Sequence, residues 1–182
     1  MEKRKFRTVD LVYCAVGAVL ITLGAWVTIP AVVEFTLQTF AIFLILALLG
    51  GKRGTVSVCV YLLLGAVGVP VFAGFHGGIA SLVGATGGYL VGFVPMALCY
   101  WLMTAKLGDK TIVKVAAMVL GLLICYAFGT AWFMNVYART SGPVGLMTAL
   151  GWCVFPFIPW DGAKMVAALL AAKALSKRMK LQ

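Results

Sequence analysis

Long apolar runs separated by short breaks dominate the pattern of hydrophobic and polar positions along the chain. A run of about 20 apolar residues is typical of a helix that spans a membrane. The last run follows an apolar stretch that contains Pro156 and Pro159. Because proline breaks helical hydrogen bonding, we expect these two residues to interrupt the helix before that run. The pattern therefore predicts six membrane-spanning helices. They cover residues 9–29, 36–50, 54–71, 79–104, 111–137 and 161–176.

The segment 36–50 is short for a span, and the segment 54–71 is of modest length. At about 1.5 Å per residue, neither crosses a bilayer comfortably on its own. We therefore expect an extended stretch beside each one to complete the crossing inside the protein. Residues 143–158 are also apolar, but prolines break them and they are too few to cross. For them we predict a re-entrant or surface-lying segment.

Composition supports an all-α integral membrane protein. The 182 residues are 63% hydrophobic and 11% charged, whereas charged residues make up about a quarter of an ordinary soluble domain. The first apolar run ends without a small-residue cleavage pattern, so we expect a retained span instead of a signal peptide. The five cysteines are scattered singly, which indicates small buried hydrophobes. We predict one domain over residues 1–182, without a metal or a cofactor.

Basic residues are divided unevenly between the two ends of the predicted spans. If six segments cross, Arg139 and Lys164 lie on one side and the remaining 13 of the 15 basic residues lie on the other. Cytoplasmic loops carry an excess of Lys and Arg, so both termini of this multi-pass cell-membrane protein are predicted to be cytoplasmic. The net charge of +10 then reflects topology, and we expect no nucleic-acid partner. The 13 residues are Lys3, Arg4, Lys5, Arg7, Lys52, Arg53, Lys106, Lys110, Lys114, Lys173, Lys177, Arg178 and Lys180.

An acid and a base stand together on the predicted external side. Asp161 and Lys164 lie three residues apart in PFIPWDGAK (156–164), which places them on one face of a helix. Charges near apolar surroundings are costly. As an N-cap, Asp161 would leave Lys164 in the first turn, where the helix dipole disfavours a cation. A ligand with a carboxylate and N–H groups accounts for both residues, and a cap with a local ion pair is the alternative.

Glycine is concentrated between Val69 and Tyr89, a stretch that also carries the only histidine, His76. Glycine lets the backbone approach a ligand closely, and irregular backbone at membrane depth is tolerated where it lines a cavity. We therefore predict that glycine-rich external loops close a ligand pocket. Close helix packing is the alternative. Glu34 either lines this pocket or is a solvated loop acid, and Arg139 competes with Lys164 for a ligand carboxylate.

Ten aromatic residues gather toward the predicted external ends of the segments. An interfacial belt explains the tryptophans and tyrosines, and walls around an apolar ligand body are the second interpretation. Both explanations can hold for different members. The ten residues are Trp26, Phe35, Phe40, Phe72, Phe75, Tyr89, Trp152, Phe155, Phe157 and Trp160.

The sequence argues against an enzyme and against ATP hydrolysis by this chain. Its serines, acids and single histidine show no spacing that pairs a nucleophile with a base. It also lacks the phosphate-binding sequence GxxxxGK[ST]. If the protein moves a solute uphill, the motor is therefore a different protein.

A stripe of small residues runs along the first predicted span. Cys14, Ala18 and Thr22 recur at every fourth position, a spacing that suits close contact with another helix. The partner is either another protein or a helix of the same chain.

Four strings, in order and in register, resemble the BioY family, the substrate-binding S component of energy-coupling factor (ECF) biotin transporters. They are FTLQTF (35–40), YLLLGAVGVPVFAGFHGG (61–78), GATGGYLVGF (84–93) and PFIPWDGAK (156–164). The resemblance implies six membrane helices, cytoplasmic termini and one biotin bound near the external surface. It also implies a separate energy module, made of a transmembrane coupling protein and two cytoplasmic ATPases.

The resemblance also assigns site residues. Asp161 and Lys164 match the family's acid and lysine at the start of the last helix. The family's glycine-rich binding segment matches Thr86, Gly87, Gly88 and Tyr89. Its second-helix motif matches Thr36, Gln38 and Thr39.

The chain departs from the family pattern at three places. Ala85 stands where proline is common, and His76 where the family has a small residue. The Cys14, Ala18 and Thr22 stripe is only a size analogue of the AxxxA pattern with which S components dock on the coupling protein.

Biotin suits the predicted site residues. Asp161 can accept hydrogen bonds from the ureido N–H groups, and Thr, Gln or backbone amides can donate to the ureido carbonyl. Aromatic residues can cover the sulfur ring, and Lys164 or Arg139 can meet the carboxylate. An S component for another small vitamin is the first alternative, because a fold does not fix its ligand. The second is a small intramembrane enzyme that uses His76 or Asp161 as acid or base.

Overall fold

The structure, a computed structural model, describes residues 7–31 and 33–178. The tail cations used for the topology prediction, Lys3, Arg4, Lys5 and Lys180, lie outside the described residues. The elements are α1 (Thr8–Trp26), β1 (Thr28–Ile29), β2 (Phe35–Thr36), α2 (Gln38–Leu49), α3 (Gly51–Ala66), the 3₁₀ turn η1 (Ala73–Phe75), α4 (Ile79–Val83), α5 (Gly87–Leu107), α6 (Thr111–Thr140), α7 (Leu146–Cys153) and α8 (Phe157–Arg178).

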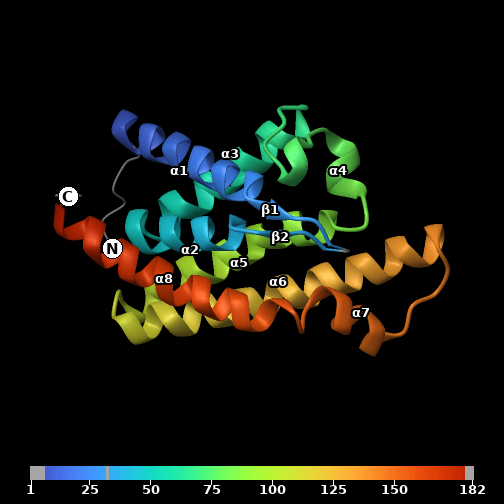
Figure 1. Cartoon of the computed structure of the whole chain (residues 1–182). Helices are drawn as coiled ribbons and strands as arrows, with labels where there is room; N and C mark the ends of the chain where they lie inside the picture. Colours follow the sequence, from blue (N-terminus) through green and yellow to red (C-terminus); the bar gives the residue numbers. More distant parts are fainter. Residues whose placement is uncertain (1–6, 32, 179–182) are drawn as a thin grey trace.

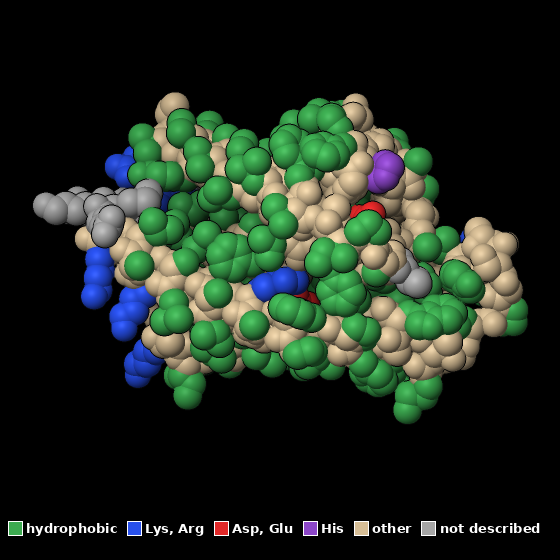
Figure 2. All heavy atoms as spheres, in the orientation of Figure 1, with side chains coloured by type: hydrophobic (Ala, Val, Ile, Leu, Met, Phe, Trp, Pro, Cys, Tyr) green, Lys and Arg blue, Asp and Glu red, His purple; other side chains and the backbone are tan. Residues whose placement is uncertain are grey.

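The long helices form one bundle. The start of α1 and the end of α8 lie at one end of it, and β1, β2, α4 and α7 lie at the other (Figure 1). Figure 2 shows Lys and Arg side chains gathered at the end that carries the start of α1. The side of the membrane that this end faces stays a prediction.

Within residues 7–31 and 33–178, three helices are long and apolar enough to cross a membrane on their own, and they are α1, α5 and α6. The pair α7 and α8 passes the same test together and is bent by 40° at the break between them. Among the described residues, α2 has 12 residues and α3 has 16, so both are short for a span, as predicted. The helical architecture is confirmed, and the number of six crossings remains a prediction.

Several predicted boundaries differ from the structure, and two of these differences have a clear physical reason. The segment 79–104 divides into α4 and α5, because the chain leaves the helical conformation at Gly84. The last helix begins at Phe157, four residues before the predicted start at 161. Pro159 does not interrupt it, since the first turn of a helix does not need a proline's missing N–H group.

The predicted partner-docking stripe lies inside the protein. Cys14, Ala18 and Thr22 are only 2%, 1% and 8% exposed. The thiol of Cys14 donates to the backbone carbonyl of Arg53 in α3, over 3.5 Å. Beside the stripe, Gly17 lies against Ser57. The structure therefore supports packing within the chain, and burial argues against docking through these side chains.

The connection between α3 and α4 is fastened to the end of α1. The Trp26 indole Nε1 donates to the carbonyl of Pro70, over 2.9 Å. The Trp26 ring also lies against the ring of Phe75, with 5.0 Å between centroids. Phe72 points inward, where its ring meets Tyr61 edge-on at 5.5 Å. These contacts hold the connection over the end of the bundle that contains the candidate site.

Candidate ligand-binding site

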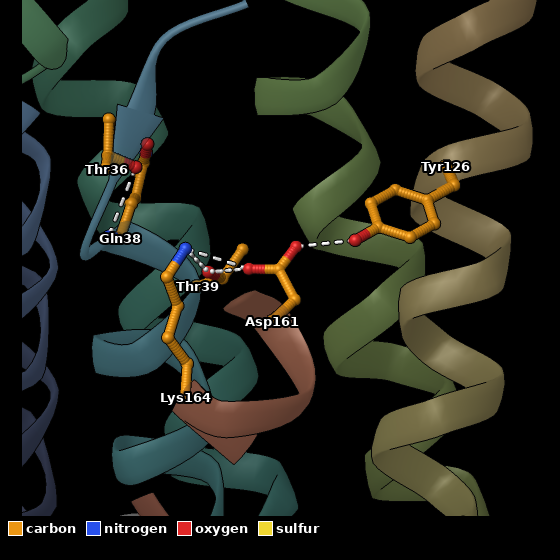
Figure 3. A network of polar contacts seen from close by, with 6 residues as sticks. All are labelled: Thr36, Gln38, Thr39, Tyr126, Asp161 and Lys164. Carbon is orange, nitrogen blue, oxygen red and sulfur yellow. Dashed lines mark hydrogen bonds and ion pairs between the residues drawn. The ribbon is translucent and has the colours of Figure 1, made fainter. Parts of the chain in front are cut away.

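Four side chains from three helices form a polar network around Asp161 (Figure 3). One carboxylate oxygen, Oδ1, accepts hydrogen bonds from Thr39 Oγ1 at 2.8 Å and from Lys164 Nζ at 2.9 Å. The other oxygen, Oδ2, accepts from the Tyr126 hydroxyl at 2.6 Å. Lys164 Nζ also donates to Thr39 Oγ1 at 3.2 Å. The network therefore joins α2, α6 and α8 through one carboxylate.

The acid and the base of this network form a buried ion pair. Asp161 is 2% exposed, and the side chain of Lys164 is 13% exposed. Each charge offsets the other, and removing one leaves its partner uncompensated in apolar surroundings. In the alternative of a cap with a local ion pair, the ion pair is present but the cap is wrong, because α8 begins at Phe157 and places Asp161 in its second turn. Instead, the carboxylate accepts from Thr39 and Tyr126, on other helices.

A cavity of about 420 Å³ opens beside the network. This volume is within the usual range of about 300–1,000 Å³ for small-molecule sites. Apolar side chains line much of it, and polar groups interrupt them at a few points. The apolar lining includes Phe72, Leu90, Phe93, Leu122 and Phe157, and the polar lining includes Glu34, Thr36, Gln38, Thr39, His76, Thr86, Tyr89, Tyr126, Asp161 and Lys164.

The aromatic residues divide between the cavity and the surface. Phe72, Tyr89 and Phe157 line the cavity. Phe157 also stacks on Phe35, with ring centroids 4.1 Å apart and planes within 9° of parallel. In contrast, Trp160 is 62% exposed. The structure therefore supports cavity lining for Phe72, Tyr89 and Phe157, and an interfacial belt formed by exposed aromatic residues stays a prediction.

Most of the predicted site residues meet at the cavity. Hydrogen bonds to other side chains hold Tyr89 and Gln38 in position. The Tyr89 hydroxyl is hydrogen-bonded to Thr130 Oγ1 at 2.9 Å. The amide nitrogen of Gln38 donates to the Tyr61 hydroxyl at 2.7 Å. The members that line the cavity are Thr36, Gln38, Thr39, Thr86, Tyr89, Asp161 and Lys164.

Three predicted site residues do not line it. Gly87 and Gly88 are packing positions, because a side chain there would meet the backbone of Leu82 and the ring of Trp132, respectively. Arg139 is exposed near the end of α6, away from the cavity lining. Lys164 is therefore the cavity cation of the two that were predicted.

Sequence reasoning missed Tyr126 and the apolar wall formed by Leu90, Phe93 and Leu122. The one available signal for Tyr126 was a hydroxyl in the middle of an apolar span, where a polar group needs a partner. Cys125 and Cys153 also line the cavity. Both are buried, in agreement with the prediction of small buried hydrophobes.

Replacing Tyr126 with phenylalanine tests the network without changing the size of the side chain. Tyr126→Phe removes one of the three donors to Asp161, and a hydrogen bond to a charged group contributes about 1.5–3 kcal/mol. We expect ligand affinity to fall about tenfold, measured by calorimetry on the purified protein. Tyr137→Phe in the same helix is the matched control and should bind like the parent. Equal affinities for all three proteins would contradict a role for Tyr126.

The site is suited to holding a small molecule that has both polar and apolar parts. Among the described residues, no group of His, Cys, Asp and Glu is arranged to hold a metal ion. The fold and the cavity thus define a membrane protein with an internal site for a small ligand.

Comparison with known proteins places the chain more narrowly. The model of the BioY family matches residues 1–181, and the chain belongs to this family. It is 41% identical over 169 residues to the biotin transporter BioY of Thermotoga maritima, across 92% of this chain and 96% of that protein. The probable biotin transporter BioY of Pyrococcus horikoshii is 37% identical over 172 residues, across 94% and 97% of the two chains.

A solved structure agrees with these relatives. The crystal structure of the S-component for biotin from an ECF-type ABC transporter superposes with a TM-score of 0.81. It is 26% identical in sequence and covers 95% of each chain. The resemblance inferred from the four strings is therefore confirmed along nearly the whole chain.

Proposed function

We propose that this chain is the biotin-binding membrane subunit of an ECF-type importer. The observation that carries the proposal is the buried network of Asp161, Lys164, Thr39 and Tyr126 beside a cavity of about 420 Å³. Membership of a family whose relatives are named biotin transporters supplies the ligand. Because the family is one of transporter components, the intramembrane enzyme is set aside.

The network has room for one further donor and one further acceptor. A carboxylate offers about four acceptor positions and an ammonium group offers three donors. In the described part of the chain, Thr39, Tyr126 and Lys164 occupy three of the positions on Asp161, which leaves one on Oδ2. Of the donors of Lys164, the same residues account for two, on Asp161 and Thr39, which leaves one.

A ureido group matches these two remaining positions. Its N–H can donate to Asp161, and its adjacent carbonyl can accept from Lys164. The thioether ring would then lie among the apolar and aromatic side chains, which include Phe72, Tyr89 and Phe157. The pairing assigns the ureido end of biotin to the Asp161 and Lys164 network.

The test of this function is biotin binding by the isolated protein. We expect the purified chain to bind biotin in preference to a panel of other small vitamins, as measured by competition. Asp161→Ala and Lys164→Ala should each weaken binding strongly. Failure of the parent to bind biotin would refute the proposed ligand, and binding of another vitamin would favour the alternative S component. Full binding by both variants would refute the site assignment.

The energy module is proposed to be a transmembrane coupling protein with two cytoplasmic ATPases. The similarity to an S-component of an ECF-type transporter supports this, and so does the absence of a GxxxxGK[ST] sequence. The distribution of basic residues supports cytoplasmic termini and an external cavity in the cell membrane. Biotin uptake should therefore rise when the chain is co-expressed with such a module.

A further inference from the structure

His76 and Glu34 stand together at the mouth of the cavity. Both line it, and they come from the connection after η1 and from the residue before β2. His76 Nε2 and Glu34 Oε1 lie 3.2 Å and 3.7 Å from the same point, the position that a Cβ atom would take on Gly74. Figure 2 shows the single histidine in purple on the surface beside an acidic side chain in red. The mouth thus carries a base and an acid that the ureido assignment does not use.

The backbone holds the histidine in this place. The Phe72 N–H donates to the carbonyl of His76 at 2.9 Å, and the His76 N–H donates to the carbonyl of Ala73 at 3.3 Å. Gly74 between them has a φ of +65°, a conformation that glycine adopts without strain. A side chain on Gly74 would also crowd the imidazole ring, whose Cδ2 is 3.1 Å from the added atom. The turn therefore keeps space for the ring next to Glu34.

A ligand that is held at its ureido end presents its carboxylate elsewhere. Among the described residues that line the cavity, only Lys164 and His76 can carry a positive charge. Lys164 is already paired with Asp161, so the pair adds no net charge for a second anion. Glu34 would repel a carboxylate at the mouth, whereas the imidazole can donate an N–H to it and, when protonated, offset its charge.

We propose that His76 binds the carboxylate end of the ligand at the mouth of the cavity and that Glu34 opposes it. The balance between the two residues determines the ratio of the affinities for a ligand with a charged tail and for one with a neutral tail. This inference rests on the proposed function, since it assumes that the ureido ring occupies the Asp161 and Lys164 network. It assigns a role to a histidine that stands where the family pattern has a small residue.

The test compares biotin with biotinamide, which has the same rings and an uncharged tail. Affinities for both ligands are measured for the parent, His76→Gln and Glu34→Gln. We expect His76→Gln to weaken biotin by about three- to fivefold, the scale of an exposed charge contact, and to leave biotinamide unchanged. Glu34→Gln should strengthen biotin by a similar factor. Biotinamide affinity also reports whether each variant keeps its fold.

Lys164→Gln separates the two possible orientations. If the ureido ring contacts Lys164, this variant weakens biotin and biotinamide equally. A loss restricted to biotin, with His76→Gln unchanged, would place the carboxylate at Lys164 and overturn the inference. An unchanged ratio of the two affinities in both His76→Gln and Glu34→Gln would also overturn it. Failure of the parent to bind either ligand would instead refute the proposed function.

Discussion

Asp161→Leu abolishes the binding site and also destabilises the fold. The substitution removes the carboxylate that pairs with the Lys164 ammonium group, and the Lys164 side chain is only 13% exposed. Breaking a buried ion pair by removing one partner costs about 3–5 kcal/mol. We therefore expect a clear drop in the melting temperature of the detergent-purified protein. Biotin affinity should fall by about a hundredfold or more, because the acceptor for the ureido N–H is lost.

The double variant Asp161→Leu with Lys164→Met separates stability from binding. Replacing both members of a buried pair by apolar residues is often neutral or stabilising. We expect the melting temperature to recover most of its loss while biotin affinity stays as low as in Asp161→Leu. A double variant that is as unstable as Asp161→Leu would show that the unpaired ammonium is not the cause. Restored binding would show that the pair does not contact the ligand.

Gly129→Ala is the second substitution from which we expect a large effect. A Cβ atom on Gly129 would lie 2.6 Å from Cγ of the Tyr89 ring, and this ring is 9% exposed with its hydroxyl bound to Thr130. The ring or the spacing of α5 and α6 must therefore shift. Overpacking of this kind costs about 1–3 kcal/mol. Because Tyr89 lines the cavity, thermal stability and biotin affinity should fall together.

Gly162→Ala is the matched control for this prediction. It introduces the same methyl group into α8, beside Asp161, where an added Cβ meets nothing within 4 Å in the described part of the chain. We expect unchanged biotin affinity and a stability equal to that of the parent or higher by up to about 1 kcal/mol. Equal losses for the two variants would contradict the packing explanation.

The sequence was sufficient to predict the helices, and less so their ends. Apolar runs indicate where a chain can be helical, but a proline is tolerated or disruptive according to its position in the helix. Pro159 falls in the first turn of α8, so this helix begins earlier than predicted. Likewise α6 continues to Thr140, beyond the predicted end at 137, and carries Arg139 away from the cavity.

The site was predictable where a charge had to be explained. Asp161 and Lys164 were found because an acid and a base near apolar surroundings are costly. Gly87 and Gly88 do not line the cavity, and the sequence could not separate the two uses of glycine, since a close approach to a ligand and a close approach to another helix need the same small residue. Tyr126 was missed because its distance to Asp161 depends on where the bundle places α6 relative to α8, which no local pattern encodes.

The shortness of α2 has a consequence for the distance that a ligand must travel. Thr39 lies in the first turn of this 12-residue helix, and it donates to the Asp161 carboxylate, which lines the cavity. At 1.5 Å per residue, α2 is about 18 Å long, whereas the hydrocarbon core of a bilayer is about 30 Å thick. In the proposed topology, in which the Leu49 end of α2 lies at one face of this core, a molecule resting against Thr39 would lie within the core and below its other face.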